Sequence, residues 1–355
     1  MNDRSSLYDR LRPRRSTLAQ AEQAALLSLD TRHLIVDDAW LLCGKDDINT
    51  ILITQEASAA DKVVPDSLIR DDQRHHVGVA PMRGIENVPL EQRSRSRQLL
   101  QLLLPRLTTS PPGWADARII LQCPEGVTAT QWLDDVLAIW PIQNQPKRGL
   151  EVTTSTFDNW LEDTLSSSTD TCALHQFIML APTPPSEPPH SITSDVVATL
   201  WLRRVPARAT NEEPMTAPSL GVTLRRPERH QHASRSNSPP KSQSVLAALL
   251  PPSQGLDQVS ETARLCAITW DGDPSGQRLD QLIDYIQHLS PDLNPVSDLW
   301  SVRNIARSLN DASPVVQLVI ACHLAKQRQG PVLLLDTHQD TQTITAIVSP
   351  GPPSH

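Results

Sequence analysis

The residue best suited to covalent chemistry in this sequence is Cys172, which stands in "STDTCALHQ" three residues before His175. A cysteine nucleophile needs a thiolate with a lowered pKa and a base within reach. Cys172 lies at the boundary between a predicted loop and an apolar segment. Cysteine is also commonly a small buried apolar residue. The sequence therefore leaves two interpretations open, a nucleophile for acyl transfer and a structural cysteine.

Two histidines could supply the base that such a nucleophile requires. His323 lies in an apolar segment typical of a helix and directly follows Cys322. Because adjacent helical residues point about 100° apart, these two side chains would not face a common substrate. A buried histidine with a hydrogen-bond partner is the simpler interpretation of His323. His338 lies in the polar stretch "THQDTQ" (337–342), between two apolar segments.

Metal and cofactor motifs are incomplete. "DGDPSG" (271–276) places oxygen-bearing side chains at alternate positions, as a calcium loop does, but its twelfth position is Leu282 instead of glutamate. The histidine pairs 75/76 and 230/232 have no third ligand at a zinc-finger spacing. The Gly-Lys pair in "CGKDD" lacks the flanking residues of a phosphate-binding loop. We expect no metal site and no cofactor.

Composition narrows the class of protein. The chain has 355 residues, 31 of them proline, and a formal charge of −8, which argues against general nucleic-acid binding because phosphate attraction needs a basic face. No run reaches the roughly 18 apolar residues of a membrane span, and residues 1–16 lack the apolar core of a signal peptide. The five cysteines are far apart without CxxC spacing, so disulfides are not expected. These features predict a cytoplasmic protein.

Strands and helices alternate along much of the chain, which favours a largely parallel α/β sheet. In the first half, Thr128 or Thr130 is expected to begin a helix, and Pro105 to interrupt another. The predicted strands are 33–38, 50–54, 117–123, 150–154, 172–182, 194–204, 263–270 and the two arms of a hairpin over 330–351, and the predicted helices are 16–29, 97–107, 130–140, 156–165, 244–250, 276–289, 296–309 and 313–329.

One segment interrupts this pattern. Residues 206–246 combine six prolines with many Ser and Arg residues and almost no apolar periodicity, which predicts a disordered Pro/Ser/Arg-rich linker or insertion. The predicted organisation is a flexible basic arm (1–15), an N-terminal α/β half (16–205), the insertion (206–246), a C-terminal α/β half (247–351) and a short tail (352–355).

The second half resembles the C-terminal half of a thiolase-like protein of the ketoacyl-synthase type. The resemblance rests on "CAITWDGDPSGQRLDQLIDYI" (266–286) as a strand and helix, "ARSLNDASPVVQLVIACHLAKQRQG" (306–330) as a small-residue stretch and long apolar helix, and "PVLLLDTHQDTQTITAIV" (331–348) as a closing hairpin. It implies an α/β fold of thiolase-like mixed sheets with helices, in two similar halves.

The sequence departs from that family where its chemistry is located. The family's helix begins with a Gly-His pair, whereas this chain has "RSLNDASP" (307–314), and the family's glycine-rich hairpin turn is "THQDTQ" here. Cys172 is followed by a predicted strand, whereas the family's nucleophile is followed by a long helix. The resemblance therefore implies a scaffold that lacks the family's catalytic motifs.

Three functions follow as hypotheses. The first is a non-catalytic binding protein, an adaptor or chaperone for a protein partner, and the resemblance extends this to an accessory protein of a bacterial type VI secretion effector. The second is an acyl-transfer or condensing enzyme that uses Cys172 with His323 or His338. The third is a structural subunit that associates with itself as a homodimer. Missing catalytic motifs and eight tryptophans, a residue favoured in interface hot spots, make the first hypothesis the preferred one.

Overall fold

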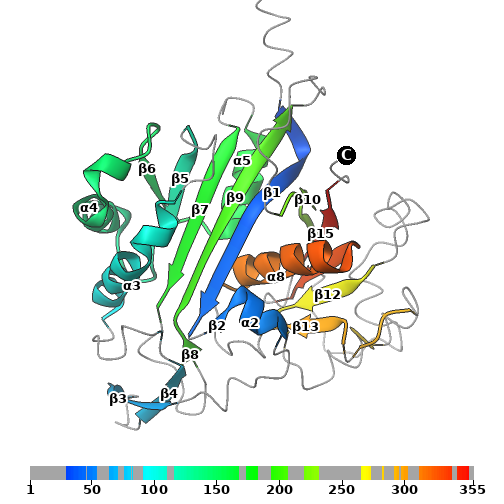
Figure 1. The fold of residues 1–355 in the computed structure, drawn as a ribbon, viewed down its shortest axis with the longest axis horizontal. Coiled ribbons are helices and arrows are strands. Elements are labelled where there is room, and N and C mark those ends of the chain that lie inside the picture. Colours follow the sequence, from blue (N-terminus) through cyan, green and yellow to red (C-terminus); the bar gives the residue numbers. More distant parts are fainter. Residues whose placement is uncertain are drawn as a thin grey trace, which may run out of the picture.

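The fold is a mixed α/β structure built on one large sheet (Figure 1). The computed structural model describes residues 29–44, 46–53, 64–70, 76–80, 82, 91–109, 116–167, 173–182, 193–206, 220–231, 265–272, 282–283, 292–295, 297–302, 312–337 and 342–351.

The large sheet contains twelve strands, and ten of them form a continuous path in the order β13-β12-β14-β15-β10-β1-β9-β7-β5-β6. Two more are attached to it, β2 (Asp46–Asp47) beside β1 and β11 (Glu228–Gln231) beside β15. The ten are β1 (Leu29–Cys43), β5 (Arg118–Gln122), β6 (Leu150–Thr153), β7 (Leu174–Ala181), β9 (Val196–Pro206), β10 (Val222–Arg225), β12 (Ala267–Trp270), β13 (Leu299–Ser301), β14 (Val332–Asp336) and β15 (Gln342–Pro350).

The path consists of the same arrangement used twice. When the five path strands of each half are numbered in chain order, both halves have the spatial order 3-2-4-5-1. In both, the second strand pairs in parallel with the third and fourth, and the fifth is antiparallel to the fourth and to the first. The halves join where the two first strands, β1 and β10, pair antiparallel over His33–Val36 and Val222–Arg225. The predicted fold of two similar halves is confirmed.

Helices occupy the connections between strands. The described helices are α2 (Ile48–Ile53), α3 (Gln92–Leu107), α4 (Ala129–Ile139), α5 (Phe157–Ser166), α8 (Ser313–Arg328) and the 3-10 turn η2 (Ile142–Asn144). A second, three-stranded sheet contains β3 (Val64–Arg70), β4 (His76–Ala80) and β8 (Thr193–Ser194).

Helix α8 lies against the sheet where the two halves meet (Figure 1). It contacts strands from both halves, among them β1 and β9 of the first and β12, β14 and β15 of the second. Residues 315–322 are all buried, so this helix is apolar around most of its circumference. Such a helix is stable only when it is enclosed on all sides. Helix α5 is its counterpart, since each lies between the third and fourth strands of its half, and the two helices touch.

Helix α4 begins where the sequence predicted. Thr128 accepts a hydrogen bond from the Gln131 backbone N–H at 3.3 Å, and the Gln131 side chain accepts one from the Thr128 backbone N–H. This capping box satisfies two N–H groups that would otherwise lack partners at the helix start.

The Thr128→Ala substitution is expected to lower the free energy of unfolding by about 1 kcal/mol, the usual loss when an N-cap hydroxyl is removed. Urea unfolding followed by tryptophan fluorescence measures this. Thr130→Ala, at an exposed position inside the same helix, is the matched control and should change stability by less than about 0.5 kcal/mol. Equal losses in both variants would contradict the cap.

Three predicted elements differ in the structure. Residues 50–54, predicted as a strand, fall mostly in α2, because the Asp47 carboxylate accepts hydrogen bonds from the N–H and hydroxyl of Thr50 and so caps a helical turn. Residues 296–309, predicted as a helix, contain the short strand β13, which pairs in parallel with β12. The predicted disordered segment 206–246 contains β10 and β11, which long-range pairing with β15 stabilises despite the local composition.

Pro105 and the segments outside the described residues concern the remaining predicted elements. Pro105 lies inside α3, which continues to Leu107, instead of interrupting it. The predicted arm, the predicted tail and the predicted helix 244–250 lie outside the described residues, as do most of 276–289 and all of 16–29 except its last residue, Leu29, which begins β1. In the part of the chain that the structure describes, no helix is long and apolar enough to cross a membrane.

Candidate functional site

Three carboxyl groups meet at the junction of the two halves. Asp271 directly follows β12, Asp336 is the last residue of β14, and Asp158 lies in the first turn of α5. Strands β12 and β14 are parallel neighbours with Trp270 opposite Leu335, so the carboxyl ends of both strands lie at the same edge of the sheet. Ligand and catalytic sites of α/β proteins form at such edges. The topology therefore makes this acidic cluster, Asp158, Asp271 and Asp336, the candidate site.

Asp271 is held by the start of the closing hairpin. The backbone N–H of Thr337 donates to Asp271 Oδ1 at 2.7 Å, and the Thr337 hydroxyl lies 3.0 Å from the same oxygen. Trp270 Nε1–H donates to Thr337 Oγ1 at 3.2 Å. Asp271 is only 3% exposed and Asp336 8% exposed. The carboxyl pair is thus fixed in an interior position and does not extend into solvent.

Burial and mutual repulsion alter the protonation of the cluster. Burial raises the pKa of Asp271 to about 7, and the charge of Asp336 and a hydrogen bond with its side chain add to this, against the two bonds from Thr337. Burial likewise raises the pKa of Asp158 to about 7; Asp336 adds to the rise, and Arg229 opposes it. Neighbouring carboxyl groups that cannot all ionise share protons. At neutral pH the cluster therefore holds both protonated and ionised carboxyl groups.

Such a cluster can donate and accept protons. Among the residues that the structure describes, no group of three or more His, Cys, Asp or Glu side chains has an arrangement that could hold a metal ion. "DGDPSG" contributes Asp271 to the cluster, while residues 273–276 lie outside the described residues.

The structure places His323 away from the acidic cluster. His323 Nε2 lies 2.8 Å from the carbonyl oxygen of Ala39, to which it donates, so the ring connects α8 to β1. Burial lowers the pKa of His323, which keeps the ring neutral near pH 7. The ring lines a separate open pocket of about 310 Å³ with Asn49, Leu52, Lys326 and Gln327.

Cys172 and His338 lie outside the described residues. In the chain, Cys172 falls between the end of α5 and the start of β7, and His338 between Thr337 and β15. The helices that correspond between the halves begin with Thr156, Phe157 and Asp158 in α5 and with residues 312–314, Ala-Ser-Pro, in α8. These described first turns carry neither a thiol nor an imidazole.

Two members of the cluster, Asp158 and Asp336, carry no motif in the sequence that singles them out. Asp336 ends the apolar run "VLLLD" and Asp271 ends "AITWD", so both are acidic residues at the end of a buried strand. That position could have identified the pair, whereas the spacing within "DGDPSG" points only to a calcium loop. Asp158 had no comparable pattern, since a first-turn aspartate commonly serves only the helix dipole.

Comparisons with known proteins support the fold and do not identify a close relative. No family model matches the sequence, and no curated protein matches it. Among solved structures, the ishigamide ketosynthase/chain length factor superposes with a TM-score of 0.52 at 10% identity, covering 90% of this chain and 100% of that one. A ketosynthase from the bacillaene synthase of Bacillus subtilis gives a TM-score of 0.53 at 8% identity, covering 91% of this chain and 71% of that one.

A third structure, the PfaC ketosynthase-chain length factor, gives a TM-score of 0.52 at 10% identity and covers 92% of this chain and 44% of that one. Identities this low show the fold alone. The repeated strand order and the coverage of nearly the whole chain lead to one conclusion: this chain has the thiolase-like fold of the ketosynthases.

Proposed function

We propose that this chain is a non-catalytic binding protein on a thiolase-like fold, an adaptor or chaperone for a protein partner. The observation that carries the proposal is the acidic cluster of Asp158, Asp271 and Asp336 at the edge where the strands end and α5 begins. Both the start of this helix and the closing hairpin turn border the catalytic centre in the family that the sequence resembles.

The electrostatics of the cluster oppose acyl transfer. The tetrahedral intermediate of that reaction is an oxyanion, and enzymes stabilise it with hydrogen-bond donors and positive charge. A carboxylate about 4 Å from a developing negative charge costs on the order of 4 kcal/mol at an effective dielectric constant of about 20. A barrier increase of that size slows a reaction roughly a thousandfold. A cluster with at least one ionised carboxylate therefore disfavours this chemistry at the junction.

Three of the described thiols also disfavour a cysteine mechanism. Burial raises the pKa of Cys123, Cys266 and Cys322 above that of an ordinary thiol. A raised pKa leaves little thiolate at neutral pH, and the thiolate is the nucleophile. Cys172 remains as the nucleophile of the acyl-transfer alternative, which stays a prediction.

The test compares the full chain with its Cys172→Ala variant. We expect neither to release thiol from an acyl-N-acetylcysteamine thioester faster than buffer does, and both to retain the same stoichiometric protein partner when tagged and expressed at natural level in the native host. Thiol release by the wild type that the Cys172→Ala variant lacks would instead establish the acyl-transfer alternative.

Self-association is the second alternative, and sedimentation equilibrium of the purified chain separates it from the proposal. A monomer that acquires a defined mass only with its partner fits an adaptor. A homodimer without any other partner fits the structural subunit. Two statements stay predictions: the partner is a type VI secretion effector, and the protein is cytoplasmic.

A further inference from the structure

Three polar side-chain atoms in the C-terminal half are buried without a hydrogen bond to any residue that the structure describes. They are Thr269 Oγ1 of β12, Trp300 Nε1 of β13 and Gln317 Oε1 of α8. The exposed fractions of these residues are 0%, 7% and 0%. Buried polar atoms of folded proteins bond, in the great majority, to the protein or to an ordered water. The described protein groups do not supply the partner of these three atoms.

The strand register places two of these side chains next to each other. Thr269 lies directly opposite Trp300 on one side and Leu334 of β14 on the other. Trp300 and Leu334 belong to the hydrophobic core that contains α8, whereas Ile268 and Trp270 of β12 pack in a separate cluster. Because side chains alternate along a strand, Thr269 points to the face of the sheet that α8 covers.

Gln317 brings the third atom to this face. Its Nε2 donates to the carbonyl oxygen of Leu335 at 3.2 Å, which fixes the side-chain amide at the end of β14. Leu335 directly follows Leu334, the residue opposite Thr269. Helix α8 also contacts β12. The three atoms therefore lie in one layer, between α8 and the carboxyl ends of β12, β13 and β14.

The hydrogen-bonding capacities of the three atoms match those of one water molecule. The indole N–H of Trp300 can only donate, the amide oxygen of Gln317 can only accept, and the Thr269 hydroxyl can do either. A water can accept from the indole, donate to the amide oxygen and form its third bond with the hydroxyl. Buried waters of globular proteins make about three hydrogen bonds each.

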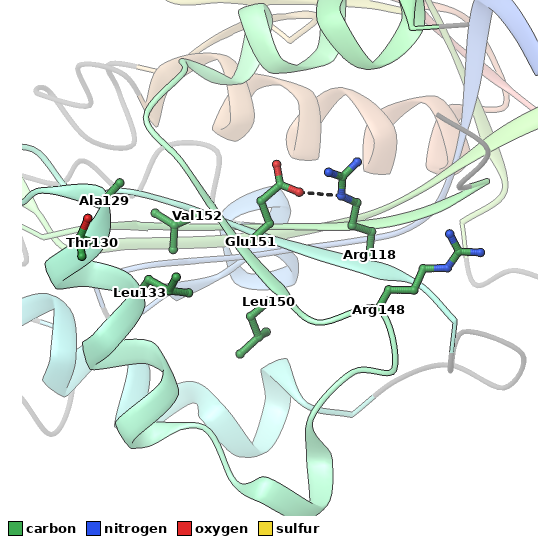
Figure 2. A pocket seen from close by; sticks show the side chains of 8 residues that line it. All are labelled: Arg118, Ala129, Thr130, Leu133, Arg148, Leu150, Glu151 and Val152. Atoms are coloured by element: carbon green, nitrogen blue, oxygen red, sulfur yellow. Dashed lines mark ion pairs between the residues drawn. The ribbon is translucent and has the colours of Figure 1, made fainter. Parts of the chain in front are cut away.

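Two other sites show polar groups that bind partners within the protein. In the pocket of about 490 Å³ between β6 and the start of α4, Arg118 and Glu151 form an ion pair at 2.6 Å (Figure 2). The indole N–H of Trp140, a residue that is 2% exposed, donates to the carbonyl oxygen of Asn144 at 3.0 Å. Trp140 and Trp300 are thus two buried indoles that differ in whether a described protein group accepts from them.

We propose that the layer between α8 and the sheet binds an ordered water, which bridges Thr269, Trp300 and Gln317. The site lies inward of the acidic cluster, because Asp336 follows Leu334 by two residues on the same face of β14. The water links α8 to β12 and β13, and it extends the polar interior of the junction into the C-terminal half. This inference is independent of the proposed function.

The first experiment measures magnetisation transfer between water and the indole N–H protons of the full chain, labelled with ¹⁵N in its tryptophans. Assignment of the wild type identifies the signals of Trp300 and Trp140 without a variant. We expect Trp300 to show a cross-peak to water whose NOE and ROE have opposite signs, the mark of a water that stays bound while the protein tumbles. Trp140 should show none. A Trp300 indole without this cross-peak overturns the proposal.

The second experiment removes the hydroxyl group with Thr269→Val, which leaves the water two of its three partners. Loss of a dry, unbonded hydroxyl would stabilise the fold, whereas loss of a bonded one destabilises it. We expect the folding equilibrium constant from urea unfolding to fall about fivefold, the usual effect of one hydrogen bond, and the Trp300 cross-peak to remain.

Thr199→Val is the matched control for this substitution. Thr199 is 5% exposed, and its hydroxyl oxygen accepts a hydrogen bond from Gln176 Nε2 at 3.3 Å, so its loss should lower the constant by a similar factor. A higher constant for Thr269→Val overturns the proposal, as does a Trp300 cross-peak that vanishes with the hydroxyl, because the signal would then be relayed through the hydroxyl proton. If Thr269→Val does not fold, the first experiment decides by itself.

Discussion

The Asp271→Asn chain is expected to be more stable than the wild type at about pH 8, by about 1–3 kcal/mol. Asp271 has a pKa raised to about 7, mainly by burial. An acid whose pKa is higher in the folded state than in the unfolded state binds its proton more tightly when folded. Its contribution to stability is therefore complete below its unfolded pKa, near 4, and is lost as the pH rises through about 7. Asparagine, which never ionises, avoids that loss.

The structure also explains why asparagine should fit. Its amide oxygen can accept the hydrogen bonds that Thr337 donates to Asp271 Oδ1, and its NH₂ group can donate toward Asp336 as the protonated acid does. Urea unfolding at about pH 5 and about pH 8 measures the effect: the wild type should lose stability between these values, and the variant should lose markedly less.

Asp135→Asn is the control with the opposite sign. The pKa of Asp135 is lowered, chiefly by a hydrogen bond from Arg93, whose Nε lies 2.6 Å from its carboxylate. A carboxyl group whose pKa is lower in the folded state than in the unfolded state stabilises the fold at a pH above its unfolded-state pKa. This stabilisation is lost as the pH falls through the folded-state pKa, so Asp135→Asn should destabilise the fold at neutral pH. If Asp271→Asn also destabilised at about pH 8, the acidic cluster would be ionised and fully hydrogen-bonded instead of proton-sharing.

Arg95→Met is expected to destabilise the fold by about 3–5 kcal/mol, the usual cost of removing one partner of a buried ion pair. Arg95 in α3 and Asp195, just before β9, both have fully buried side chains. Arg95 Nε and Nη2 each donate to a carboxylate oxygen of Asp195 at 2.7 Å, and the Met82 N–H lies 3.4 Å from Oδ2. The substitution leaves the Asp195 carboxylate in the interior without the positive charge and the two hydrogen bonds of Arg95.

Two comparisons distinguish this effect from a simple loss of packing. The double variant Arg95→Met, Asp195→Leu should recover much of the lost stability, since replacing both charges removes the unpaired one. Lys147→Met breaks an exposed pair, in which Nζ lies 3.3 Å from Asp116 with both side chains more than half exposed, and should cost less than about 1 kcal/mol. A single Arg95 variant that unfolds no more easily than Lys147→Met would show that the pair is not buried in solution.

The sequence predicts those elements whose own residues determine them. The strand at 117–123 and the helix from Thr128 emerge as β5 and α4 because an apolar run and a capping box are local features. The errors concern elements that depend on distant partners: Val222 and Leu224 form a buried strand only because β1 and β15 flank them. A three-residue strand such as β13 is too short to show a periodicity of its own.

The candidate site likewise depends on contacts between residues that are far apart in the sequence. Its three carboxyl groups lie at positions 158, 271 and 336, and only the parallel pairing of β12 with β14 and the repeated placement of α5 and α8 bring them together. Asp271 and Asp336 can each be recognised in the sequence as an aspartate at the end of a buried strand. That the two lie close together and share protons follows only from the topology.

The pairing of β1 also affects how the chain can be synthesised. Asp38 lies opposite Trp201, and His33 lies opposite Arg225, so the two long-range partners of the strand at the centre of the sheet, β9 and β10, come well over a hundred residues downstream. Its near neighbour β2 pairs with the last residues of β1, Leu42 and Cys43. At about 5–20 residues per second, the ribosome needs on the order of 10–30 s to deliver β9 after β1 has been made. During that interval most of the nascent β1 is an apolar strand whose edges lack their native partners. We expect folding to depend on a chaperone that shields this segment until translation has passed β10.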